Sequence, residues 1–147
     1  MKEFFLDKLE YDYQANRTWI EYIEEQEDNI PDFILKSISH IINVHHIWNA
    51  RLFGKAAESD SWDVLPVRYL HQLNLQNYRE TTDYLEKIEL GARVNYHSSE
   101  GIRFEKEDAN ILYHMLTHSN YHRAQIVMDL KQQGLKHPSL NFISFRN

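Results

Sequence analysis

The chain has 147 residues, which fits one domain whose core needs no metal or disulfide to be stable, so any metal is expected to be functional rather than structural. With 42% apolar and 26% charged residues, the composition is that of a globular protein and excludes an intrinsically disordered one. A net charge of -6 without any block of Lys or Arg argues against nucleic-acid binding, because phosphate contacts require clustered cations.

The chain contains no cysteine, which excludes disulfides, zinc–thiolate sites and a cysteine nucleophile, so thiol chemistry would need an external thiol. No apolar run approaches the roughly 18–20 residues that cross a bilayer. The N-terminal Glu3 and Asp7 come too early for a signal peptide. We therefore expect a soluble, cytoplasmic protein with no membrane partner and a single domain over residues 1–147.

The hydrophobic pattern predicts an all-α fold, a four-helix bundle. Apolar residues recur at spacings of three and four along four segments, which places them on one face of each helix. Glycine favours positive φ just past a helix end, so Gly54, Gly91 and Gly134 are expected to end the last three helices. The four segments are roughly 3–27, 31–54, 65–91 and 107–134.

The segment between the third and fourth helices alternates polar and apolar residues. Residues 93–97 and 102–105 flank a glycine-containing turn at 98–101. This pattern is that of a short β-hairpin, and a plain loop is the equal alternative. Residues 55–63 read as a polar connection.

Nine histidines are an excess for this length, and six of them form two groups, His40/His45/His46 and His114/His118/His122. In the fourth helix the spacing of four residues makes a ladder along one edge, turning by about 40° per step. Neighbours at this spacing lie about 5–6 Å apart at Cβ, close enough for two imidazoles to share a metal. A third ligand must then come from another helix.

Periodicity in the second helix places His45 in the middle of the apolar stripe and His40 to its side. Spacing alone therefore favours His45 as the inward histidine. Histidine pairs on helices are also common as core or surface residues, so spacing leaves open whether any metal is bound.

Two longer motifs carry a resemblance to a known family. The segments HIINVHHIWNARL (40–52) and LTHSNYHRAQI (116–126) resemble the DinB/YfiT-like family of damage-inducible, metal-dependent proteins. DYQANR (12–17) and PSLNFI (138–143) are similar to its first-helix and C-terminal segments. The sequence departs from the common family pattern in having Ala124 for glycine and Asn141 for aspartate.

The resemblance implies a dimeric four-helix bundle whose divalent metal (zinc, nickel, iron or manganese) is held by one histidine of the second helix and two of the fourth. At the matching positions these are His40, His118 and His122. The family motif thus selects His40 as the ligand of the second helix, in place of His45, which the hydrophobic periodicity favours as the inward histidine. The two agree if the site lies in a groove at the edge of the bundle.

Three neutral imidazoles leave a metal with an open position, where it lowers the pKa of bound water or thiol. Relatives that use low-molecular-weight thiols imply a metal-dependent thiol transferase, or a hydrolase-like enzyme, with a small-molecule substrate. Tyr121, Gln125 and His114 are candidates to support the ligands, and each is equally explained by packing or solvent exposure. His45, His46 and Trp48 are expected to pack or face solvent.

Two other hypotheses remain open. One is a non-catalytic, metal-binding, stress-associated homodimer, and the other is a helical bundle with incidental histidines and no metal. An enzyme should have an open metal position facing a pocket, whereas a closed structural site should have a fourth protein ligand. The sequence names no catalytic residue.

Overall fold

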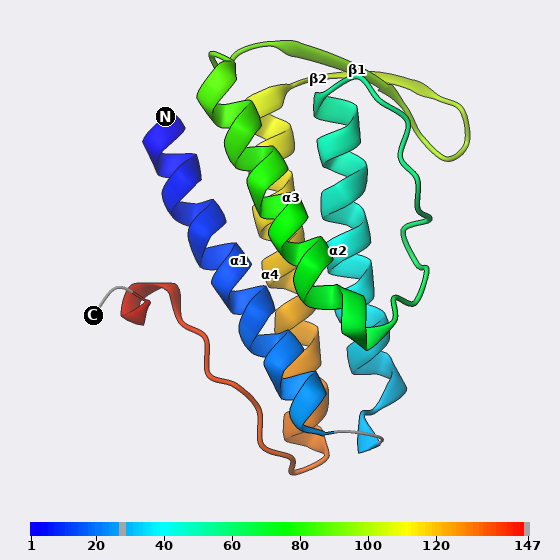
Figure 1. Ribbon diagram of the computed structural model, residues 1–147, viewed down its shortest axis with the longest axis vertical. Coiled ribbons are helices and arrows are strands. Elements are labelled where there is room, and N and C mark those ends of the chain that lie inside the picture. Colours follow the sequence, from blue (N-terminus) through cyan, green and yellow to red (C-terminus); the bar gives the residue numbers. More distant parts are fainter. Residues whose placement is uncertain (27–28, 146–147) are drawn as a thin grey trace.

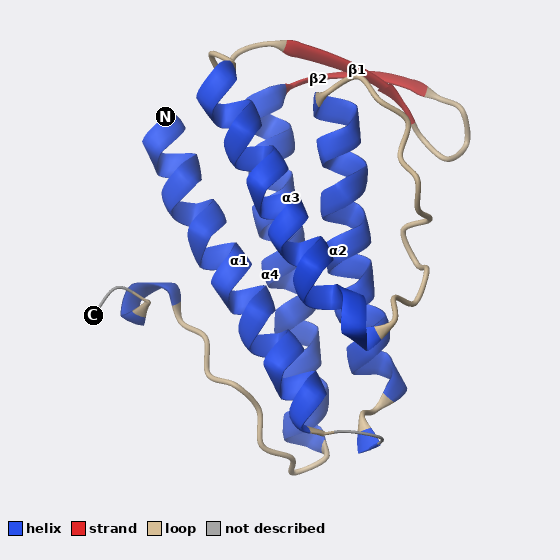
Figure 2. Cartoon of the chain, in the orientation of Figure 1, coloured by secondary structure: helices blue, strands red, loops and turns tan. Residues whose placement is uncertain are grey.

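The computed structural model describes residues 1–26 and 29–145, and within them the chain forms four α-helices and one β-hairpin (Figure 2). The hairpin joins the third helix to the fourth, and its strands pair antiparallel. The predicted four-helix fold is confirmed, and the hairpin rather than the plain loop is correct. The elements in chain order are α1 (Lys2–Glu25), α2 (Asp32–Leu52), α3 (Val67–Lys87), β1 (Arg93–His97), β2 (Arg103–Glu107), α4 (Asp108–Gln132) and the 3-10 helix η2 (Phe142–Ser144).

The helix ends differ from the expected ones mainly at α3. Ile88 is already extended (φ -114°, ψ 134°), so the helix stops before Gly91. The chain turns here because the Asp108 carboxylate at the start of α4 accepts a hydrogen bond from the Gly91 N–H at 2.8 Å. Gly54 and Gly134 follow α2 and α4 with φ of 66°, as expected. The predicted end of the first helix, residue 27, lies outside the described residues.

Each helix has two close neighbours: α1 and α2 both pack against α3 and α4, and they face each other across the bundle. Because α2 and α3 run in the same direction, the connection 53–66 must return along the length of α2, where Figure 1 shows it. The hairpin lies across the end of the bundle at which α2 and α3 finish (Figure 1). None of the described helices combines the length and apolar character needed to span a membrane.

Two hydrophobic clusters form the core, one toward each end of the bundle. Residues from α1, α2, α3 and α4 contribute to both, and the hairpin contributes to the second. The first cluster contains Trp19, Ile20, Ile23, Ile34, Ile38, Ile41, Ile42, Leu70, Ile126 and Leu130. The second contains Phe5, Leu9, Leu52, Tyr84, Leu85, Val94, Ile111, Leu112 and Met115.

Buried polar side chains from all four helices accompany these clusters. Arg123 of α4 forms a fully buried ion pair with Asp12 of α1, with Nη1 and Oδ1 2.7 Å apart. The same Nη1 donates to Oδ1 of Asn16 at 2.6 Å. A buried guanidinium is stabilised only when charge and hydrogen bonds compensate its lost hydration, so these contacts fix how α4 is rotated against α1.

Candidate metal centre

His40 of α2 and His118 and His122 of α4 lie together between these two helices. Each offers one ring nitrogen, and the three nitrogens lie within 4.8 Å of one another. Nε2 of His40 and Nε2 of His118 are 3.1 Å apart. His40 is buried and the other two are half-buried, so this histidine triad lies toward the edge of the bundle.

The orientation of the two α4 histidines follows from the residues that succeed them. Ser119 and Arg123 are buried against α1, where the Arg123 guanidinium donates to the Ser119 hydroxyl. Successive residues of a helix are about 100° apart around its axis. His118 and His122 are therefore turned away from α1 and toward α2, on one line of the helix.

His40 is held by the connection that returns along α2. Its Nδ1 lies 2.7 Å from the carbonyl oxygen of Ser61. Because a carbonyl can only accept, Nδ1 carries the proton and the Nε2 lone pair faces the other two histidines. On the outer side, the indole of Trp62 stacks on the His40 ring, with centroids 3.7 Å apart and planes 11° apart.

Two further hydrogen bonds anchor the connection to α2, at Ser39 and Asn43 on either side of His40. The Asn43 amide donates to the carbonyl oxygen of Asp63 at 2.8 Å, and the Leu65 N–H donates to the Ser39 hydroxyl at 3.0 Å. Sequence reasoning treated residues 55–63 as a plain polar connection and missed their part in the site. The available signal was a single tryptophan, Trp62, in an otherwise polar segment.

Burial keeps all three histidines of the triad neutral at pH 7. Desolvation, reinforced by His122, His40 and His114, lowers the pKa of His118 to about 3. Burial also lowers the pKa of His40, although its hydrogen bond to Ser61 opposes this effect. The same cause lowers the pKa of His122. Neutral imidazoles with free lone pairs are the form that binds metal.

The donor set fits a divalent first-row metal ion. Four-coordinate zinc with Zn–N bonds of about 2.0–2.1 Å separates its ligand nitrogens by about 3.3 Å, close to the 3.1 Å between His40 and His118. Among the described residues, this triad is the only group of His, Asp or Glu side chains compact enough to hold an ion. Three protein ligands with no fourth are typical of catalytic rather than structural sites.

The chain matches the model of a known protein family. The DinB family profile matches residues 9–147, which includes all three histidines of the triad. The chain belongs to the DinB family. No curated protein matches this DinB chain.

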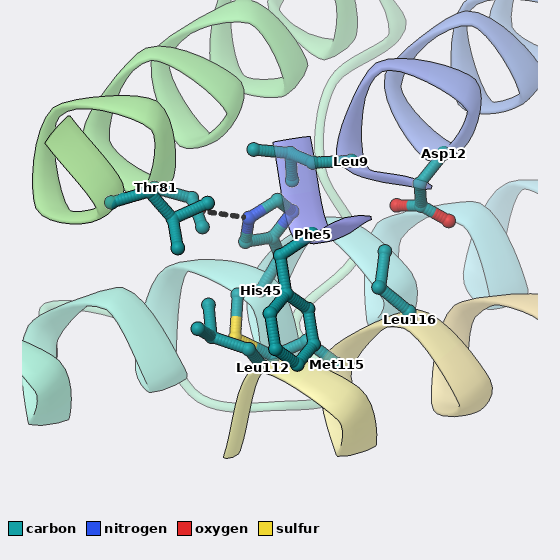
Figure 3. Close-up of a pocket in the computed structure, with 9 residues that line it drawn as sticks. Phe5, Leu9, Asp12, His45, Thr81, Leu112, Met115 and Leu116 are labelled. Atoms are coloured by element: carbon teal, nitrogen blue, oxygen red, sulfur yellow. Dashed lines mark hydrogen bonds between the residues drawn. The ribbon is translucent and has the colours of Figure 1, made fainter. Parts of the chain in front are cut away.

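The remaining histidines of this DinB protein have other partners. His45 points into the bundle, as periodicity predicted, and its Nε2 lies 2.8 Å from the Thr81 hydroxyl oxygen. Figure 3 shows its ring among the residues that line a pocket, with Asp12 on the α1 side. The cavity is small, about 10 Å³. Burial lowers the pKa of His45 to about 4. His46 faces the connection, where its Nε2 lies 3.5 Å from the backbone nitrogen of Glu58.

Two of the predicted supporting residues, Gln125 and Tyr121, lie against His122, and the third, His114, lies outside the triad. Gln125 lies within hydrogen-bonding reach of His122, and this contact opposes the lowering of the pKa of His122. The exposed Tyr121 ring packs edge-on against His122, with centroids 5.2 Å apart. His114 lies outside the triad, with its ring 5.7 Å from that of His118. Trp48 packs edge-on against His114.

Proposed function

We propose that His40, His118 and His122 bind one divalent metal ion, and that this DinB protein is a metal-dependent thiol transferase or hydrolase-like enzyme acting on a small substrate. The observation that carries the proposal is the convergence of three neutral ring nitrogens without a fourth protein ligand among the described residues. Zinc, nickel, iron and manganese are all candidates, because availability and geometry decide which metal occupies an imidazole site.

A bound metal would lower the pKa of a coordinated water or thiol toward neutral pH. The chain's own residues have separate tasks. His40, oriented by the Ser61 carbonyl, presents Nε2, and Trp62 covers the outer face of its ring. The thiol substrate must come from outside, because the chain has no cysteine.

Elemental analysis of purified, tag-free protein tests the metal site. We expect about one equivalent in the wild type and a clear loss in His118→Ala. His114→Ala is the matched control, because it removes the preceding histidine of the same ladder and leaves the triad intact. Absence of metal from the wild type after reloading with zinc, nickel, iron and manganese, or equal loss in both variants, would contradict the proposal.

The second candidate is a non-catalytic metal-binding homodimer associated with stress. Exposed aromatic side chains favour it, because Phe4, Tyr113 and Tyr121 line a groove of about 540 Å³ beside α1 and α4. Sedimentation velocity tests the dimer, with Tyr113→Lys expected to convert it to a monomer. Thiol transfer or hydrolysis by the metal-loaded wild type would favour the enzyme over this candidate.

A further inference from the structure

A second groove, of about 730 Å³, reaches Ser61, the residue whose carbonyl contacts His40. It lies between α2, the connection that follows it and β1 with its turn. Ser61, whose carbonyl holds His40, lines one end, and Arg51, Tyr96 and His97 line the groove as well. Ser61 is therefore the point at which the groove comes near the triad, although no histidine of the triad lines it.

One face of α2 connects the triad to this groove. His40, Val44, Trp48 and Arg51 are spaced by four, four and three residues, which puts them on a single line of the helix. Arg51 follows His40 by 11 positions, roughly 16 Å of helix rise. Helical side chains lean toward the N-terminus, so Arg51 reaches back over Trp48 toward the triad.

The Arg51 guanidinium lies against two aromatic rings, Trp48 and Tyr96, which themselves pack edge-on with centroids 5.1 Å apart. Its Cζ is 4.4 Å from the ring centroid of Trp48 and 4.6 Å from that of Tyr96. Nη2 donates to the carbonyl oxygen of His97 at 3.3 Å. Arginine has five N–H donors, and no carboxylate within the described residues forms an ion pair with Arg51. The stacked guanidinium therefore has donors left for a ligand.

The other charges of the groove also favour an anion. Lys55 adds a second cation to its lining. Asp60 is the one carboxylate that lines it within residues 1–26 and 29–145, and its Oδ1 already accepts from the Trp62 N–H at 3.0 Å.

We propose that Arg51 binds an anionic group, a carboxylate or a phosphate, at the far end of the substrate whose reacting end lies at the histidine triad. This inference rests on the proposed function. A planar guanidinium whose position is fixed by two aromatic contacts and one hydrogen bond is preorganised for bidentate binding of such a group. The substrate is then an elongated small molecule whose anionic group lies on the order of 10 Å from its reacting atom, given the helix rise between the two sites and the reach of Arg51.

NMR titration of the metal-free protein tests the anion site without the triad metal. The probes are inorganic phosphate, acetate and neutral acetamide at low ionic strength, and the readouts are the Nε–Hε resonance of Arg51 and the indole N–H of Trp48. We expect saturable shifts at both residues with phosphate or acetate, and none with acetamide. The stronger anion identifies which group the site prefers.

The variant Arg51→Gln is expected to weaken binding of that anion at least tenfold. Arg68→Gln is the matched control, because Arg68 also stacks on an aromatic ring, that of Tyr69, outside the groove. We expect its affinity to equal that of the wild type. If Arg51→Gln does not fold, the wild-type titration still decides, because the largest shift must occur at Arg51.

Two outcomes would overturn the inference: no saturable shift at Arg51 with either anion, or equal anion affinity in the wild type and Arg51→Gln. Metal content in His118→Ala reports on the triad independently. If the wild type holds metal but shows no anion binding, the anion site alone is contradicted. If it binds the anion but holds no metal, the proposed metal centre alone is contradicted.

Discussion

The Nδ1 atom of His40 lies 2.7 Å from the carbonyl oxygen of Ser61, 21 residues further along the chain. This contact joins α2 to the connection that follows it and sets the tautomer of one histidine of the triad. The next residue, Trp62, then stacks on the same ring. The connection therefore helps to position the candidate metal centre as well as joining two helices.

Replacing Trp62 by alanine should weaken metal binding. An aromatic stack contributes about 0.5–1.5 kcal/mol, so we expect the zinc dissociation constant to rise roughly 2–10-fold as His40 loses its packing partner. Competition with a chromophoric chelator measures this change. Trp62→Phe keeps a stacked ring and should stay within about twofold of the wild type by the same reasoning; equal affinity in all three proteins would show that the stack has no part in binding.

Metal binding should raise the melting temperature of the wild type. A ligand at 100 times its dissociation constant stabilises the folded state by about 2.7 kcal/mol, and at this chain length each kcal/mol corresponds to roughly 2–4 °C. Differential scanning fluorimetry with added zinc should therefore show a rise of about 5–10 °C. His114→Ala should show the same rise and His118→Ala little of it; a full rise in His118→Ala would place the stabilising metal elsewhere.

Breaking the buried ion pair should destabilise the bundle strongly. Arg123→Met leaves the Asp12 carboxylate buried without its cation, which is expected to lower the free energy of unfolding by about 3–5 kcal/mol. Urea denaturation of the metal-free protein measures it. The control is Arg17→Met, which breaks the exposed pair with Glu21 and should cost less than about 1 kcal/mol. Similar losses in the two variants would argue against a special role for the buried pair.

The buried His45 should make stability depend on pH. Its pKa is about 4 in the folded state and near 6.5 in the unfolded chain, so the unfolded state binds the proton more tightly. The contribution is fully present above about pH 6.5 and is lost as the pH falls toward 4. At pH 5 the free energy of unfolding should have lost about 2 kcal/mol through this residue, at about 1.36 kcal/mol per pKa unit.

Urea denaturation of metal-free protein at pH 8 and pH 5 checks this dependence. His45→Gln has no imidazole to protonate at this position, so its loss of stability between the two pH values should be smaller by about 2 kcal/mol. All other titratable groups are the same in both proteins, so their contributions cancel in the comparison. An identical pH dependence in the two proteins would mean that His45 is not held neutral by its burial.

Local patterns in the sequence predicted most of the fold. The spacing of apolar residues located all four helices, and the alternation before α4 located both strands of the hairpin. Glycine marked the ends of α2 and α4, where its positive φ is found. These features depend on backbone preferences and on which side of an element is apolar, which neighbouring residues decide.

Periodicity could also say that His45 points inward, and it does. It could not select His40 for the triad, and this selection came from the family motif instead. The helical wheel places His40 beside the apolar stripe, and the residue is buried because Ser61 and Trp62 return over it and two histidines of α4 pack against it. A pattern within one helix contains no information about a distant segment that covers it.

The sequence by itself therefore determined the helices and the histidine ladder of α4, since each arises from residues close in the chain, and it left the hairpin and a plain loop as equal alternatives. Only the tertiary structure decided that Ser61 orients His40, that Arg123 pairs with Asp12, and that Arg51 contacts two aromatic rings without an ion pair to any described carboxylate. These contacts join residues far apart in the chain. They form because the packing of the four helices buries some polar groups. A buried polar group requires a hydrogen-bond or charge partner, and another element supplies it.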